Sequence, residues 1–388
     1  MNIIEKDKTY IAGTYNRFPV HIVKGKGSVV VDDSGKEYID MGSGIGVTSF
    51  GMADDEWVAA VTKQLSLVQH TSNLYYTTPC AELAEILCKR TGLSKVFFAN
   101  SGAEANECAI KVARKYASMK KGSDCATIVT LKNSFHGRTI TTLAATGQEH
   151  YHELFQPLTQ GFCHIEANSG ADEFEKMAAQ NNVAAVIVEC IQGEGGVNTL
   201  EPAFVKRIAD ICKQHDILLI VDEVQTGNGR TGKLYAYMHY DIQPDIVTTA
   251  KGLGGGLPIG ACMLGEKVQN VLEFGDHGST YGGNPVACAG AVSVINRLDD
   301  AFLDEVKTKS EYVFNELSNA PGVMSVSGLG LMIGIKTEKP AKDIVAACMD
   351  KGVLCLTAKD KVRLLPALNI PFDVLKKAIQ TIKDVCTE

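Results

Sequence analysis

Short runs of apolar residues, each followed by a polar turn, recur through the middle of the chain. They cover residues 96–99, 126–129, 184–189, 217–221, 246–247 and 261–264. Runs that are apolar throughout are typical of strands covered on both faces. Between them, apolar positions recur at helical spacing, as in residues 105–116 and 202–215. We therefore predict an α/β fold with a mostly parallel sheet and helices on both of its faces.

The start of the chain has a different pattern. Residues 27–31, which precede a turn at 32–35, predict a hairpin. Two helices are expected next, one over residues 54–69 and one from 78 to 92, where a proline suits the first turn.

Beyond Gly290 the pattern changes again and predicts one long helix that ends near Leu317. Short strands around residues 323–326, 331–335 and 362–365 follow, and an amphipathic helix over 372–385 closes the chain. We expect a large domain over residues 51–288 and a smaller α+β domain over 289–388, with residues 1–50 packing against the smaller one.

The composition disfavours several classes of protein. The chain has 388 residues, of which 45% are hydrophobic and 21% charged, as is ordinary for a soluble globular protein. A net charge of -7 argues against a nucleic-acid partner. No apolar run could span a bilayer, and residues 1–7 lack the features of a secretory signal. We therefore expect no membrane association and a cytoplasmic location.

The twelve cysteines are scattered along predicted helices and strands without a Cys-x-x-Cys spacing. Buried free thiols are the expected state, because cytoplasmic proteins rarely keep disulfides. His150 and His152 could bind a metal together, but no cluster of Cys, His or Asp accompanies them. We expect no metal site.

Two charged residues follow predicted strands at places where chemistry is expected. Lys251 lies in a glycine-rich turn after residues 246–247, and Asp222 follows the run 217–221. The carboxyl ends of parallel strands meet at the crevice where open α/β sheets bind ligands. A pyridoxal phosphate site needs a lysine for the cofactor's aldehyde and a carboxylate for its ring nitrogen. From these residues alone, a solvated lysine and a capping aspartate remain alternatives, whereas neither a P-loop nor a dinucleotide motif fits the glycines.

Three motifs together resemble a known family. Residues 222–225 (Asp-Glu-Val-Gln), 229–232 (Gly-Arg-Thr-Gly) and 250–252 (Ala-Lys-Gly) are similar to the signature of class III aminotransferases of the ornithine and acetylornithine type, which use pyridoxal phosphate. The similarity extends over nearly the whole chain. It implies fold type I of the pyridoxal phosphate enzymes, with a large sheet domain and a smaller α+β domain. It also implies a homodimer with the active site at the subunit interface.

The resemblance places the cofactor phosphate at the backbone of Gly102 and Ala103, which follow Ser101 at the start of a predicted helix. A helix N-terminus presents free N–H groups to an anion, although a structural capping role would also explain Ser101. Thr280 matches a threonine that binds the phosphate from the neighbouring subunit.

The resemblance also assigns residues to the cofactor ring. Phe135 matches an aromatic residue that stacks on the ring, and Val224 matches the residue that packs on its other face. Asp222 matches the carboxylate that keeps the ring nitrogen protonated, and Glu223 follows it in the same cofactor-binding motif. Gln225 matches a side chain near the ring hydroxyl. Core packing would equally explain a single phenylalanine.

Five residues are expected to contact the substrate. Arg138 and Arg363 match two arginines that bind substrate carboxylates, for which a guanidinium fork is well suited. Glu194 matches a glutamate that pairs with Arg363 and releases it when 2-oxoglutarate brings its own carboxylate. Ser279 and Tyr15 match further contacts on the substrate side.

Lys251 has two implied roles, as the residue that binds the cofactor covalently and as the acid and base at the substrate carbon. Residues 70–73 and 237–240 resemble the acetylornithine branch, and Ile45 lies where ornithine 5-aminotransferases carry a tyrosine. The implied reaction transfers the δ-amino group of N2-acetylornithine to 2-oxoglutarate, as in arginine biosynthesis. Ornithine, succinylornithine and 4-aminobutyrate remain alternative donors. A pyridoxal phosphate racemase or decarboxylase and a non-enzymatic binding protein are the other classes left open.

Overall fold

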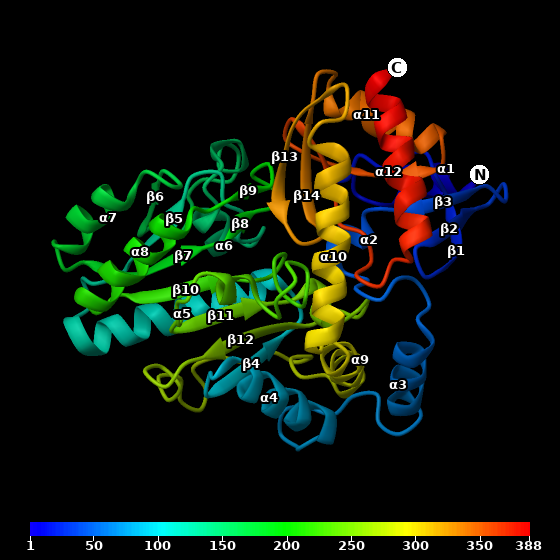
Figure 1. The fold of residues 1–388 in the computed structure, drawn as a ribbon. Coiled ribbons are helices and arrows are strands. Elements are labelled where there is room, and N and C mark those ends of the chain that lie inside the picture. Colours follow the sequence, from blue (N-terminus) through cyan, green and yellow to red (C-terminus); the bar gives the residue numbers. More distant parts are fainter.

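A seven-stranded sheet forms the centre of the larger part of the molecule (Figure 1). The computed structural model describes residues 1–388, and the strands lie in the order β4-β12-β11-β10-β7-β5-β6. Their bounds are β4 Lys95–Ala99, β5 Thr127–Leu131, β6 Phe162–Ile165, β7 Val183–Val188, β10 Leu218–Asp222, β11 Ile246–Thr249 and β12 Gly260–Leu264. Neighbouring strands from β11 to β6 are parallel, whereas β12 is antiparallel to both β11 and β4. The predicted mostly parallel sheet is confirmed.

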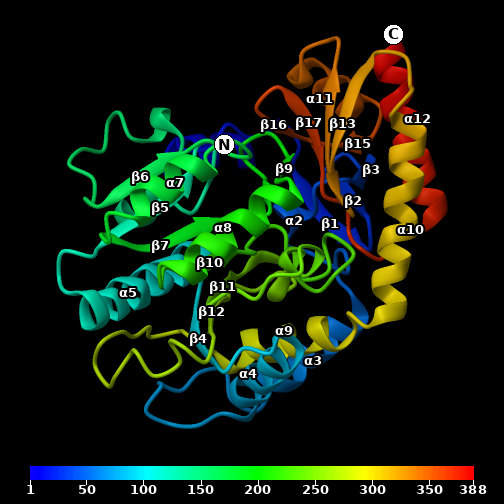
Figure 2. The ribbon, with the colours of Figure 1, turned by 60° about the vertical axis from the view of Figure 1, so that its left-hand side comes forward.

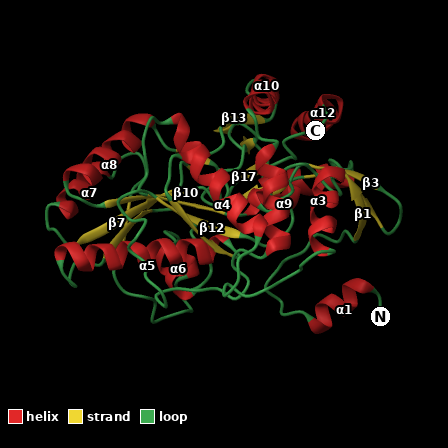
Figure 3. Cartoon of the chain, turned by 90° about the horizontal axis from the view of Figure 1, so that it is seen from below, coloured by secondary structure: helices red, strands yellow, loops and turns green.

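Helices cover both faces of this sheet. Helices α5 (Gly102–Lys121) and α6 (Ile140–Ala145) lie on one face, and α7 (Ala171–Ala178) and α8 (Pro202–Gln214) lie on the other (Figure 3). Every residue of β7, β10, β11 and β12 is buried. This covering on two sides explains why these strands are apolar throughout rather than alternating.

The sequence specifies α5 at both of its ends and along one side. Ser101 Oγ accepts a hydrogen bond from the backbone N–H of Glu104 at 3.2 Å. Gly122 ends the helix with a φ of 96°, a conformation that glycine adopts at little cost. The predicted apolar stripe is buried, and its members are Ala105, Cys108, Ala109, Val112 and Tyr116. The stripe packs α5 against the central sheet.

A four-stranded antiparallel sheet, in the order β13-β14-β17-β16, organises the C-terminal part. The strands are β13 Val323–Leu329, β14 Met332–Thr337, β16 Leu356–Ala358 and β17 Lys361–Leu364. The accompanying helices are α10 Asp300–Leu317, α11 Ala341–Asp350 and α12 Phe372–Thr387. Helices α10 and α12 pack alongside each other at the outside of the molecule (Figure 2).

The first part of the chain forms the hairpin predicted from its sequence. Its strands are β1 Ile22–Lys26, β2 Val29–Asp32 and β3 Glu37–Asp40. Strand β3 also pairs in parallel with β15 (Val353–Leu354), so the N-terminal strands and the C-terminal part share one sheet. By contrast, helix α1 (Ile3–Tyr10) buries no residue and stands away from the rest of the chain (Figure 3).

The long helix predicted between Gly290 and Leu317 is wrong. The chain forms two helices there, α9 (Pro285–Asn296) and α10. Asp299 interrupts them because its side chain accepts a hydrogen bond from the backbone N–H of Phe302 at 2.8 Å and so caps α10. An aspartate at this position satisfies a free helix N–H and favours a new helix start.

The helices before the central sheet follow the predictions more closely. Helix α4 (Thr78–Thr91) ends where expected, at Gly92, which has a φ of 73°. Helix α3 (Asp55–Leu65) is shorter than predicted and does not reach residue 69. Among all the helices, none combines the length and the apolar character that crossing a bilayer requires.

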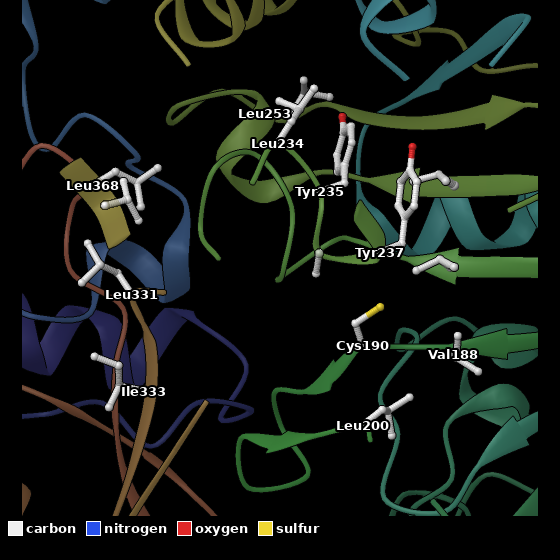
Figure 4. Packing of buried hydrophobic residues seen from close by; sticks show 14 of the residues in the cluster. Val188, Cys190, Leu200, Leu234, Tyr235, Tyr237, Leu253, Leu331, Ile333 and Leu368 are labelled. Carbon is white, nitrogen blue, oxygen red and sulfur yellow. The ribbon is translucent and has the colours of Figure 1, made fainter. Parts of the chain in front are cut away.

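A continuous apolar cluster joins the central sheet to the C-terminal part. It contains 62 buried residues. Figure 4 shows members from the side of the central sheet and members from the C-terminal part, among them Val188, Cys190, Leu200, Leu331, Ile333 and Leu368. Because protein interiors are packed as densely as organic crystals, this cluster holds the two parts in a fixed relation. Side chains from both parts can therefore be placed accurately around one site.

Trp57 connects α3 to the turn that carries Lys251. Its Nε1 donates a hydrogen bond to the carbonyl of Gly254 at 3.0 Å. A Cβ atom added to Gly255 or Gly290 would lie 2.8 or 2.9 Å from the same Nε1. The indole therefore occupies the space that these glycines leave between the turn and α9.

Replacing Trp57 by alanine is expected to lower the free energy of unfolding by about 2–4 kcal/mol, because it removes a packed aromatic ring and its hydrogen bond. Urea unfolding followed by circular dichroism measures the change. Val58→Ala, an exposed position on the same helix, is the control and is expected to stay within about 0.5 kcal/mol. Equal effects of the two substitutions would contradict this role of Trp57.

Candidate active site

A cavity of about 460 Å³ lies at the carboxyl ends of the parallel strands. Its lining includes Phe135 after β5, Glu189 after β7, Asp222 at the end of β10, Lys251 after β11 and Gly102 at the start of α5. Open α/β sheets bind ligands at this edge because the loops of several strands meet there. The two charged residues that the sequence singled out therefore share one cavity.

Lys251 begins a short 3-10 turn, η3 (Lys251–Leu253), just after β11. Its φ of 43° is rare for a residue other than glycine, and such strain persists where the surrounding structure enforces it. Burial lowers the pKa of its ammonium group, and the charge of Arg363 acts in the same direction, while Glu194 and Asp222 oppose the shift. A lowered pKa leaves more of the amine neutral, which is the form that attacks a carbonyl or accepts a proton.

Three hydrogen bonds hold the buried carboxylate of Asp222. Its Oδ1 accepts from the backbone N–H of Val224 at 3.0 Å, and its Oδ2 accepts from Asn106 Nδ2 and His136 Nδ1, both at 2.8 Å. Burial would lower the pKa of His136, but the hydrogen bond and charge of Asp222 outweigh it and raise that pKa. Because an ionised carboxylate only accepts hydrogen bonds, Nδ1 of His136 is the donor to Asp222. One lone-pair direction on Oδ1 is left for a group in the cavity.

Asn106 and His136 are partners of Asp222 that the sequence motifs did not reveal. Both side chains are almost fully buried, and Asn106 Oδ1 in turn accepts a hydrogen bond from Thr248 Oγ1 on β11 at 2.7 Å. A signal was available, because Asn106 interrupts the buried side of α5 and buried polar groups are nearly always hydrogen-bonded.

Glu189 is a second buried carboxyl group in the cavity, and the sequence predicted it only as the end of a strand. Its Oε2 accepts a hydrogen bond from the backbone N–H of Phe135 at 2.9 Å. Burial raises the pKa of Glu189 to about 7; the His136 charge lowers it, and the Asp222 charge adds to the increase. This carboxyl group therefore changes protonation near neutral pH.

The N-terminus of α5 forms an anion-binding end of the cavity. The first backbone N–H groups of a helix have no partner within the helix, and the helix dipole adds positive potential there. Gly102 and Ala103 supply these groups and line the cavity. A Cβ atom on Gly102 would lie 2.6 Å from Val224 Cγ1, so only glycine fits. A phosphate group suits this position.

Most of the residues expected around a cofactor ring line the cavity, namely Phe135, Asp222, Val224 and Gln225. Glu223 does not. Its fully buried carboxylate accepts hydrogen bonds from Thr226 Oγ1 at 2.5 Å and from the backbone N–H of Tyr237 at 2.8 Å. Consecutive residues at the end of a strand point to opposite sides. The side chain of Glu223 is therefore directed away from the site, contrary to the expectation from its motif.

Arg363 and Glu194 form an ion pair beside the cavity. Arg363 Nη1 donates to Glu194 Oε1 at 2.6 Å and to Gln225 Oε1 at 3.1 Å. Burial raises the pKa of Glu194, but the charge and hydrogen bond of Arg363 outweigh it and lower the pKa. Arg363 is only 3% exposed, and its Nε has no partner. A buried guanidinium group with an unused donor is suited to a second carboxylate.

Arg138 lines the cavity and, unlike Arg363, has no acidic partner in the chain. Its guanidinium carbon lies 4.2 Å from the ring centre of Tyr151 and 5.5 Å from that of Phe135. Both arginines that the sequence singled out are therefore close to the cavity.

The remaining three candidates lie outside the cavity of a single chain. Thr280 lines a separate small pocket that also includes Asn73. Ser279 Oγ accepts a hydrogen bond from Asn100 Nδ2 at 3.0 Å, and Asn100 lines the main cavity, so Ser279 is next to its rim. Tyr15 is 72% exposed.

The fold and the cavity define an enzyme of fold type I among the pyridoxal phosphate enzymes. The family described as Aminotransferase class-III matches residues 10–386, and the chain belongs to this family. It is 50% identical over 388 residues to a Haemophilus ducreyi protein named acetylornithine aminotransferase, covering 100% of this chain and 98% of that protein.

Solved structures agree with this assignment. An ornithine aminotransferase from Toxoplasma gondii ME49 is 33% identical with a TM-score of 0.94, covering 99% of this chain and 94% of that chain. An N-acetylornithine aminotransferase from Stenotrophomonas maltophilia K279a is 35% identical with a TM-score of 0.85, covering 99% and 98%. The resemblance found from the sequence motifs is therefore confirmed at the level of the family and the fold.

Glu189→Gln should stabilise the protein increasingly as the pH rises. Because the pKa of Glu189 is raised from 4.5 to about 7 in the folded state, the wild type binds this proton more tightly when folded and loses stability as the pH rises from 4.5 to 7. Glutamine stays neutral. The difference in free energy of unfolding between variant and wild type should grow by about 1–3 kcal/mol between pH 5 and pH 8.

Urea unfolding at the two pH values measures this difference. Glu153→Gln, on an exposed residue, is the matched control and should show no such growth. If the difference in free energy of unfolding between Glu189→Gln and wild type is the same at pH 5 and pH 8, the raised pKa is contradicted.

Proposed function

We propose that this aminotransferase binds pyridoxal phosphate in the described cavity and transfers the δ-amino group of N2-acetylornithine to 2-oxoglutarate, as in arginine biosynthesis. The observation that carries the proposal is the presence of Lys251 and Asp222 in one cavity, beside the Arg363–Glu194 pair. The names of the most similar proteins support the choice of donor.

The residues of the cavity fit the cofactor. Gly102 and Ala103 would bind its phosphate, and Phe135 and Val224 would contact the faces of its ring. Asp222 would accept a hydrogen bond from the protonated ring nitrogen through the free lone pair of Oδ1. When bound, pyridoxal phosphate supplies an aldehyde and an electron-accepting ring.

Lys251 moves the proton in the proposed reaction. Its amine, whose pKa is lowered by burial, takes up the proton from the δ-carbon of the amino donor. His136 and Asn106 meanwhile hold Asp222 in its orientation, because both donate hydrogen bonds to Oδ2. A negative charge at this place stabilises positive charge on the ring nitrogen.

The Arg363–Glu194 pair lets one site accept two different substrates. N2-acetylornithine carries one carboxylate, which Arg138 would bind, and Glu194 then keeps Arg363 neutralised. 2-oxoglutarate carries two carboxylates, and the second would replace Glu194 on Arg363. Arg363 then has a carboxylate partner in both halves of the reaction, which avoids the large energetic penalty of a buried unpaired guanidinium group.

Transfer of the amino group to the cofactor tests the donor directly. Protein reconstituted with pyridoxal phosphate should lose its visible absorbance when N2-acetylornithine alone is added, and 2-oxoglutarate should restore it. Among N2-acetylornithine, ornithine, succinylornithine and 4-aminobutyrate, the first should show the highest kcat/KM. An about 100-fold preference for 4-aminobutyrate would refute the proposed donor.

Lys251→Ala should abolish both the spectral change and turnover, because no other lysine lines the cavity. Lys359→Ala, on an exposed lysine, is the control and should leave both unchanged. The wild-type protein could bind the cofactor normally and yet fail to regain its visible absorbance when 2-oxoglutarate is added. A racemase or decarboxylase would then be the better interpretation.

The same proposal includes a homodimer in which Thr280 binds the phosphate of the partner's cofactor. Thr280 does not line the cavity of its own chain. Tyr75 lines the same small pocket as Thr280 and is exposed, as are its chain neighbours Leu74 and Tyr76 and the residue after Thr280, Tyr281. Exposed apolar patches of this kind mark interfaces, and a second copy would cover them.

Subunit mixing tests the place of Thr280. Thr280→Asp should repel the phosphate, and Lys251→Ala should remove the catalytic amine, so each variant alone should be inactive. A mixed dimer should contain one intact site if Thr280 acts across the interface. Random pairing on co-expression should then restore about a quarter of the activity, since half of the dimers are mixed and each has one intact site. No restoration would show that Thr280 acts within its own chain.

A further inference from the structure

The guanidinium group of Arg138 is held in an unusual way. Arg363 is oriented by Glu194 and Gln225, whereas the contacts of Arg138 are with aromatic faces, the closer being Tyr151 at 4.2 Å. An ion pair occupies N–H donors of an arginine, but a contact with a ring face does not. The side chain of Arg138 is exposed, and the contact with Tyr151 orients its guanidinium group while leaving the donors free.

The main chain holds Tyr151 in a defined place. It closes a 3-10 turn, η1 (Glu149–Tyr151), and the next residue, His152, contacts the carbonyl of Leu143 on α6 through Nε2 at 2.8 Å. Because α6 starts just after Arg138, this contact fixes the turn relative to the arginine. The ring of His150 also lies against that of Tyr151, with 3.9 Å between the ring centres and 40° between the planes.

Tyr151 also connects the arginine to the proposed ring site. Its ring meets that of Phe135 edge-on, with 6.0 Å between the centres and 71° between the planes. Arg138 thus lies beside two rings whose mutual orientation is set. A displacement of Tyr151 would remove the closer of the two ring contacts that orient the guanidinium group.

We propose that Tyr151 is a positioning residue that keeps Arg138 open for a substrate carboxylate, so that the enzyme has one permanently available carboxylate site and one that Glu194 controls. This inference rests on the proposed function in that Arg138 binds the carboxylate of N2-acetylornithine and the distal carboxylate of 2-oxoglutarate. Tyr151 determines specificity for substrates that bear a carboxylate far from the reacting carbon.

Two substitutions of Tyr151 separate the effect of the ring face from the effects of side-chain bulk and of the hydroxyl group. Tyr151→Phe keeps the ring face and should change KM for N2-acetylornithine by less than about twofold. Tyr151→Leu keeps apolar bulk without a π face and should raise KM by about 5- to 30-fold with little change in kcat. Leu154→Ala, on an exposed residue of the same loop, is the control and should change neither constant.

A substrate without the carboxylate gives the decisive comparison. N-acetylputrescine is N2-acetylornithine with hydrogen in place of the carboxylate, and its kcat/KM should be the same in wild type and Tyr151→Leu. Arg138→Ala should raise KM for N2-acetylornithine as well, and adding Tyr151→Leu to it should have no further effect, because the two residues act through one contact. An equal loss for both substrates, or additive effects in the double variant, would overturn the proposal.

Binding without turnover gives an independent measurement. N2-acetylnorvaline has the carboxylate but no δ-amine, and calorimetry should show its Kd raised in Tyr151→Leu and unchanged in Tyr151→Phe. If N2-acetylornithine proves a poor donor, the proposed function fails while the same comparison on 2-oxoglutarate still tests Tyr151. An unchanged Kd for 2-oxoglutarate and for N2-acetylnorvaline in Tyr151→Leu would overturn the role of Tyr151 alone.

Discussion

Charged groups at the carboxyl ends of β10 and β11 and within β17 are buried, and each needs an opposite charge or a hydrogen bond to remain there. Asp222 is paired with His136, and Glu194 with Arg363. Lys251 lies between these pairs without a hydrogen-bonded acid, and its pKa is lowered as a result of burial. The pairing thus leaves one amine reactive while it keeps the surrounding charges stable.

The fold provides the rigidity that this arrangement requires. Asp222 ends β10 of the central sheet, Lys251 follows β11, and Asn106 belongs to α5 packed on the sheet. Arg363 lies on β17 of the C-terminal sheet. The apolar cluster shared by the two parts fixes the distance between them. Because an ion pair depends steeply on separation in a buried site, the contact of Arg363 with Glu194 depends on that packing rather than on either part alone.

Arg138 and Arg363, the two arginines proposed to bind carboxylates, illustrate two ways of keeping a cation available. A neighbouring acid can neutralise the guanidinium group and later exchange for a substrate carboxylate, as for Arg363. An aromatic face can instead orient it without using its donors, as for Arg138. The first arrangement suits a carboxylate that only one of two substrates carries, and the second suits a carboxylate that both carry.

The sequence by itself determined the alternation of strands and helices, because strands covered on both faces must be apolar throughout, as residues 217–221 are. It also determined the chemical candidates Lys251 and Asp222, since each follows a buried strand where ligands bind. The family resemblance added Arg363 and Glu194, which lie far apart in the chain and form no local pattern.

Only the tertiary structure decided which of these residues meet. At the end of β10 the side chain of Asp222 faces the cavity, whereas that of Glu223 points to the other side. No spacing rule indicated that Glu223 accepts a hydrogen bond from Thr226 instead. Glu189 and Tyr151 became visible only when the strands were placed side by side, and only then were the partners of Asn106 identified, because these partners come from distant segments. Local patterns record which face of an element is apolar, whereas contacts between elements depend on how the whole chain packs.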